Sequence, residues 1–266
     1  MFTVQHQAIA YSPLNALSLA RASQLAYQDE WTVAHTARSW QFKRTQFFDR
    51  GHTQAFLMSN DQVIILAFRG TEPTNLKDWM NNANAKLVKH EEGRVHQGFQ
   101  KGLEAVWPEI LLQVKGMRNH NQSLFVTGHS LGGALATLAV RQLQTAQQSV
   151  QGLYTYGSPR VGDETFARAF EARFLTQTFR MVNHNDFVTR IAPRSFGYEH
   201  VEQCHYFDAD GDLHVGKQVW RNFLERVKGS VEDFLDAEGL VADHDLSAYE
   251  ANLQRQLGRS AFPKSA

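Results

Sequence analysis

The spacing of apolar residues changes along this chain, and the change predicts its first elements. Residues 14–27 carry apolar side chains at helical spacing. Two β-rich runs follow at 53–58 and 63–68, and the turn residues Asn60 and Asp61 separate them. The pattern therefore predicts a helix followed by a β-hairpin.

From residue 94 onward, helical and strand-like runs alternate. The predicted order is helix 98–114, strand 124–127, helix 131–144, strand 152–156, helix 164–174 and strand 178–182. Strands that are joined by helices pair in parallel, and the helices cover both faces of the sheet. We therefore predict an α/β fold with a mostly parallel central sheet and helices on both faces.

The C-terminal part continues with two short strands and two helices. The strands are predicted at 205–207 and 213–215, and the helices around 220–237 and 246–257. The chain has 266 residues, of which 42% are apolar, so it is large enough for a full core and small enough for one domain. No repeat or low-complexity linker divides it, and we expect a single domain over residues 1–266.

Charge and cysteine content exclude several classes of protein. Lys and Arg together number 27, as do Asp and Glu, and no basic run occurs, so nucleic-acid binding is not expected. The single cysteine, Cys204, cannot form an intramolecular disulfide or a zinc framework, and we expect no cofactor and no required metal. Residues 1–10 do not resemble a secretory signal, which favours a cytoplasmic protein and leaves export without a signal open.

Residues 128–132 carry the first candidate chemistry. They read Gly-His-Ser-Leu-Gly and fit the G-x-S-x-G nucleophile elbow, a sharp turn between a strand and a helix. The elbow makes Ser130 the candidate nucleophile at the carboxyl end of a central strand, and it makes the amide of Leu131 a donor for an oxyanion. The alternative is that Ser130 simply caps the helix that follows.

A nucleophilic serine needs a histidine that a carboxylate orients, and in this fold the chain order is serine, acid, histidine. Asp186 follows a predicted strand closely and is preferred as the acid, because Asp163 has the position of a helix cap. Several histidines follow Asp186, and chain order alone leaves all of them open: His200, His205, His214 and His244.

Six ordered blocks of the chain resemble the class 3 lipase family, which is fungal-lipase-like. The blocks are FRGT (68–71), VHQGF (95–99), TGHSLGG (127–133), YGSPRVG (156–162), NDFV (185–188) and FGYEH (196–200). The resemblance covers roughly residues 55–255 and implies an α/β-hydrolase fold that needs no cofactor.

The resemblance also implies roles for individual residues. It implies Ser130 as nucleophile, Asp186 as the acid and Thr71 as the second oxyanion residue, beside Leu131. In the family, the catalytic histidine follows the last strand and precedes the terminal helix. His244 matches that position, whereas a histidine in the FGYEH block resembles a structural residue.

The segment after residue 71 stands where the family carries its lid. Its candidate lid residues are Glu72, Leu76, Trp79 and Met80, and the segment is more polar than a strongly membrane-seeking flap. The implied substrate is a lipid ester or another carboxylic ester, met in solution or at a lipid–water interface. Triacylglycerol hydrolysis is the first expectation. Phospholipase A1 activity, feruloyl-type esterase activity and a catalytically silent binding module are the alternatives.

Overall fold

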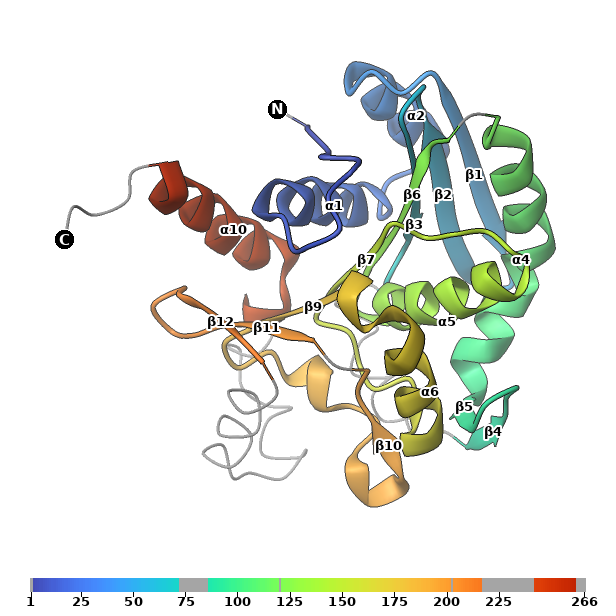
Figure 1. Cartoon of the computed structure of the whole chain (residues 1–266), viewed down its shortest axis with the longest axis vertical. Helices are drawn as coiled ribbons and strands as arrows, with labels where there is room; N and C mark the ends of the chain where they lie inside the picture. Colours follow the sequence, from blue (N-terminus) through green and yellow to red (C-terminus); the bar gives the residue numbers. More distant parts are fainter. Residues whose placement is uncertain (1, 72–85, 120, 202, 217–241, 262–266) are drawn as a thin grey trace.

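The computed structural model describes residues 2–71, 86–119, 121–201, 203–216 and 242–261 (Figure 1). The predicted helix at 220–237 and the candidate lid residues Glu72, Leu76, Trp79 and Met80 lie outside the described residues. No helix in the described ranges is long and apolar enough to cross a membrane.

An eight-stranded sheet forms the centre of the protein (Figure 1). Its order is β1-β2-β3-β6-β7-β9-β11-β12, and neighbours from β3 to β11 pair in parallel, whereas the strands at both ends pair antiparallel. The strands are β1 (Arg44–Arg50), β2 (Thr53–Ser59), β3 (Val63–Phe68), β6 (Ser123–His129), β7 (Gly152–Tyr156), β9 (Thr178–Asn183), β11 (Cys204–Phe207) and β12 (Leu213–Val215). The predicted α/β fold with a mostly parallel sheet is confirmed.

Helices cover both faces of this sheet, and each face has its own apolar core. One face packs against α4 (Gln97–Met117), α5 (Leu131–Thr145) and α6 (Glu164–Phe174), and the other against α1 (Pro13–Leu25) and α10 (Leu246–Ala261) (Figure 1). Alternate residues of a strand point to opposite faces of a sheet. In β3, Ile64 and Leu66 enter the first core, and Val63 and Ile65 enter the second.

Several elements were not predicted, because their sequences carry a weak apolar signal. Helix α2 (Glu30–Ser39) buries only Val33 and Ala37, and β1 is an edge strand with charged residues at both ends. A small second sheet has the order β10-β8-β5-β4 and consists of β4 (Leu87–Lys89), β5 (Arg94–His96), β8 (Gly162–Asp163) and β10 (Tyr198–Glu199). Strands of two or three residues are too short to show an alternating pattern. The expectation of one domain over residues 1–266 stays a prediction.

Helix α5 approaches the sheet so closely that its second residue must lack a side chain. A Cβ atom on Gly132 would lie 2.3 Å from the carbonyl oxygen of Phe68 in β3, which is rigid backbone. Gly116 in α4 offers the opposite case, since a Cβ atom there would meet nothing within 4 Å.

We expect Gly132→Ala to lower the free energy of unfolding by about 1–3 kcal/mol, because the added methyl group overpacks the helix–sheet contact. Gly116→Ala is the matched control, and it should be neutral or raise the free energy of unfolding by up to about 1 kcal/mol through helix propensity. Urea unfolding followed by circular dichroism measures both. Equal stability of the two variants would contradict the packing argument.

Candidate active site

Ser130 occupies the turn between β6 and α5. Its backbone has φ 56° and ψ −129°, a strained conformation for a residue with a side chain, and the residue is completely buried. The turn is possible because its neighbours are small: a Cβ atom on Gly128 would lie 2.2 Å from the carbonyl oxygen of Gly132. The Ser130 side chain makes no capping hydrogen bond to α5, so it does not act as a plain helix cap.

Asp186 follows β9 and begins the short 3-10 helix Phe187–Arg190. The residue is completely buried, and its Oδ1 accepts a hydrogen bond from the amide of Val188 at 2.9 Å. Both carboxylate oxygens lie 3.0 Å from Nδ1 of His244, and Oδ2 accepts a hydrogen bond from the hydroxyl of Tyr249 at 2.5 Å. Burial and the charge of Asp186 raise the pKa of Tyr249 well above its usual value, so this hydroxyl stays a donor.

His244 is 6% exposed, and its ring lies against that of His129, which precedes Ser130. The amide of Ser130 donates to the carbonyl of Tyr156 at 2.9 Å, and the next residue, Gly157, lies against the Asp186–His244 pair. Since Nδ1 of His244 bonds the carboxylate, Nε2 is the ring atom that is left to take up a proton. Within the described part of the chain, this Nε2 and the Oγ of Ser130 are both buried and have no hydrogen-bond partner.

The other candidate histidines lie elsewhere, in structural positions. Nε2 of His200 bonds the carbonyl of Thr189 at 2.7 Å, and burial lowers the pKa of His200 well below its usual value. His205 is buried on β11, where burial lowers its pKa to about 4, and His214 pairs with Asp208 at 2.7 Å in the partly exposed hairpin that follows.

Asp163 also has the role that its sequence position indicates. Its carboxylate caps α6 by accepting a hydrogen bond from the amide of Phe166 at 3.0 Å, and it pairs with Arg94. No group of three His, Cys, Asp or Glu side chains in the described ranges is arranged to hold a metal ion.

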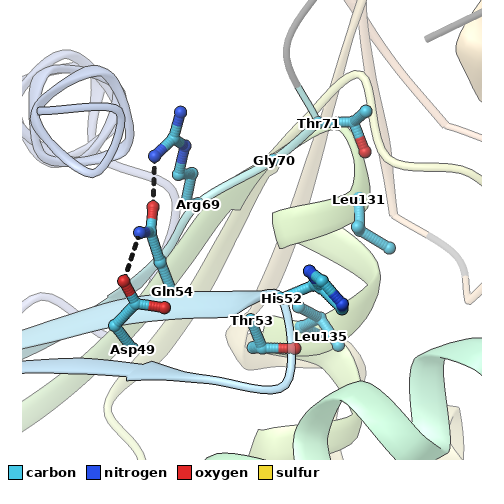
Figure 2. A pocket seen from close by; sticks show the side chains of 9 residues that line it. All are labelled: Asp49, His52, Thr53, Gln54, Arg69, Gly70, Thr71, Leu131 and Leu135. Atoms are coloured by element: carbon cyan, nitrogen blue, oxygen red, sulfur yellow. Dashed lines mark hydrogen bonds between the residues drawn. The ribbon is translucent and has the colours of Figure 1, made fainter. Parts of the chain in front are cut away.

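The two oxyanion candidates lie side by side. Leu131 is the first residue of α5, so its amide points out of the helix N-terminus beside Ser130. Thr71 follows β3, and both residues line a cavity of about 450 Å³ (Figure 2). Gly70 allows this approach, because a Cβ atom there would lie 2.5 Å from the carbonyl oxygen of His129.

His129 connects the nucleophile turn to the helical turn that carries His244. Burial lowers the pKa of His129 well below its usual value, so the ring is neutral and carries one N–H group. Its Nε2 donates to the backbone carbonyl of His244 at 2.7 Å, and its Nδ1 accepts from the hydroxyl of Tyr27 at 2.7 Å. The rings of His129 and His244 lie 4.3 Å apart. The sequence motif contains His129 but does not reveal this contact.

Gly157 and Asp243 also help to hold Asp186 and His244 in place. Gly157 has φ 58°, and a Cβ atom there would lie 2.4 Å from Oδ2 of Asp186 and 2.8 Å from Nδ1 of His244. Oδ2 of Asp243 bonds Nδ1 of His184 at 3.0 Å and accepts from the amide of Asn185 at 3.2 Å. Because Asp243 precedes His244, these bonds tie the helical turn of His244 to the loop that carries Asp186.

The sheet, the strained turn at its carboxyl edge and the Asp–His pair define an α/β-hydrolase. Residues 65–196 match the lipase (class 3) family. The chain belongs to this class 3 lipase family, as its sequence blocks predicted.

Similar proteins agree with this assignment. The chain is 36% identical to the secreted mono- and diacylglycerol lipase 1 of Fusarium solani, over 54% of this chain and 44% of that protein. It is 29% identical to a lipase of Rhizomucor miehei, over 60% of this chain and 42% of that protein. The chain thus spans about half the length of the curated relatives that it matches. The crystal structure of an MDLA variant from Penicillium cyclopium superposes with a TM-score of 0.68 at 21% identity, covering 89% of this chain and 94% of that chain.

The expected cytoplasmic location is wrong. The Fusarium solani relative and those of Penicillium cyclopium and Penicillium camembertii are named secreted lipases, and these names contradict the expectation of a cytoplasmic protein. The expectation rested on the lack of a recognisable signal in the first ten residues, and that observation alone does not determine where a protein is located.

We expect His129→Leu to lower kcat on a soluble nitrophenyl ester by about ten- to a hundredfold, since the carbonyl of His244 loses its donor and the base loses its position. His129→Gln supplies an amide donor and should recover part of the rate. Stopped assays on both variants, with melting temperatures measured in parallel, test this. A His129→Leu protein with unchanged kcat would show that the contact does not position the base.

Buried neutral histidines should make the protein acid-sensitive. His205 has a folded pKa of about 4 against an ordinary 6.5, so between these values the unfolded chain binds a proton that the folded chain does not. Stability is therefore lost as the pH falls from about 6.5 to about 4, by about 1.4 kcal/mol per pH unit for this residue. His205→Phe should flatten the pH dependence of urea unfolding by that slope, and parallel curves for the variant and the wild type would contradict the assignment.

Proposed function

We propose that this protein hydrolyses carboxylic esters of lipids through an acyl-enzyme on Ser130. One observation carries the proposal: Oγ of Ser130, in a strained turn, and Nε2 of His244, whose Nδ1 is held by the buried carboxylate of Asp186, are both buried and make no hydrogen bond to the described residues. Serine, histidine and aspartate in this relation act as nucleophile, general base and orienting acid. The presence of Ser130, Asp186 and His244 argues against a catalytically silent binding module.

The reaction proceeds in two steps. Oγ of Ser130 attacks the ester carbonyl carbon while Nε2 of His244 takes the hydroxyl proton, and Asp186 stabilises the imidazolium that forms. The backbone amides of Thr71 and Leu131 stabilise the oxyanion. His244 then donates the proton to the departing alcohol, a water molecule attacks the acyl-enzyme with His244 again as base, and the acid leaves.

The substrate is a lipid ester of the acylglycerol kind. The relatives named mono- and diacylglycerol lipase and triacylglycerol lipase support this class. We further propose that the protein acts both on dissolved short-chain esters and on esters at a lipid–water interface, because the sequence after Thr71 is polar. The chemistry requires no metal ion.

Replacing the nucleophile tests the proposal directly. We expect Ser130→Ala to lower turnover of nitrophenyl butyrate by roughly a millionfold, as removal of a catalytic serine does elsewhere. A fluorophosphonate probe should label the wild type and not the variant, and EDTA should leave the wild-type rate unchanged. Near-normal turnover by Ser130→Ala would end the proposal.

A further inference from the structure

A cavity lined by both polar and apolar residues opens beside the proposed oxyanion residues. It has a volume of about 450 Å³, within the range of about 300–1,000 Å³ that is usual for small-molecule sites (Figure 2). Thr71 and Leu131 line one end of the cavity, and the side chain of Leu135 adds a further apolar part to its lining. The remaining lining residues are Asp49, His52, Thr53, Gln54, Arg69 and Gly70.

The turn between β1 and β2 forms one wall of this cavity. Arg50 pairs with Thr53, so the turn has only two residues, and both of them have positive φ angles: 57° for Gly51 and 67° for His52. Two-residue turns with these angles match the twist of paired strands and hold a defined shape. The wall is therefore fixed before any ligand arrives.

A chain of hydrogen bonds crosses this wall (Figure 2). Nη1 of Arg69 donates to Oε1 of Gln54, and Nε2 of Gln54 donates to Oδ2 of Asp49 at 2.7 Å. The guanidinium of Arg69 also lies 5.7 Å from the ring centre of Tyr27. The cavity thus presents a set of polar groups, held by hydrogen bonds, beside Thr71 and Leu131, the proposed oxyanion residues.

The chemistry of this lining decides what fits. An alkyl chain is a poor occupant, because it would remove water from the polar groups of Arg69, Gln54 and Asp49 and offer no hydrogen bond in return. A phosphate group is also disfavoured, because the carboxylate of Asp49 balances the positive charge of Arg69. Neutral hydroxyl groups suit the lining, since each can donate and accept.

We propose that this cavity binds the alcohol portion of the ester and recognises its free hydroxyl groups, so that partial glycerides react better than fully acylated ones. The inference rests on the proposed function, because it assigns a place to the alcohol that Ser130 releases. The acyl chain lies outside the cavity. Gln54 and Asp49 then determine specificity without taking part in the chemical step.

Three butyrate esters test recognition of the alcohol portion separately from catalysis at Ser130. Monobutyrin, tributyrin and ethyl butyrate share one acyl group and differ in the free hydroxyls of the alcohol. Gln54→Leu and the exposed Asp49→Leu should each lower kcat/KM on dissolved monobutyrin by about tenfold, as expected for one lost hydrogen bond to a held polar group. The values on ethyl butyrate should change less than about twofold.

Gln62→Leu, an identical exchange at an exposed position on the β2–β3 turn, is the matched control and should leave all three values unchanged. Parallel loss on monobutyrin and ethyl butyrate, or no loss on monobutyrin in a folded Asp49→Leu protein, would overturn the cavity's role. Different results would contradict the proposed function. These are a wild type that hydrolyses none of the three esters, or a Ser130→Ala variant that hydrolyses ethyl butyrate as well as wild type does.

Discussion

The carboxylate of Asp186 is completely buried, and the arrangement of the site depends on how this charge is satisfied. A charge that is removed from water without partners costs several kcal/mol, so the fold must bring donors to it. The donors come from three places in the chain: the amide of Val188, the ring of His244 and the hydroxyl of Tyr249. Satisfying the two oxygens of Asp186 therefore fixes three segments together: the loop after β9, the helical turn of His244 and helix α10.

Tyr249 extends this requirement into the core. Its hydroxyl donates to Asp186 and accepts a hydrogen bond from the amide of Asn183 at 3.1 Å, while its ring packs on the sheet beside Tyr156. Helix α10 also packs against α1, and Arg21 pairs with Glu250 across that contact. Asp186, the proposed catalytic acid, thus lies at a junction between the sheet and the two helices that cover one of its faces.

The sequence predicted the parts of this arrangement that depend on local pattern. Ser130 sits in a five-residue motif between a strand and a helix, and Asp186 lies three residues after the end of a strand, so both positions could be inferred from the chain. The choice of His244 among four histidines needed the resemblance to a family, because no local pattern distinguishes a base from a packed imidazole. Contacts such as Tyr27 to His129 join residues about a hundred positions apart, and nothing in the pattern of either segment indicates them.

The bond from His129 reaches the backbone carbonyl of residue 244 and not its side chain. In the proposed reaction the imidazole of His244 alternates between neutral and charged forms, and a contact to the ring would strengthen and weaken with each change. A contact to the peptide group has nearly constant strength through the cycle. The helical turn of His244 can therefore keep its place while the charge on the imidazole changes, and in the proposed reaction proton transfer is uncoupled from movement of the main chain.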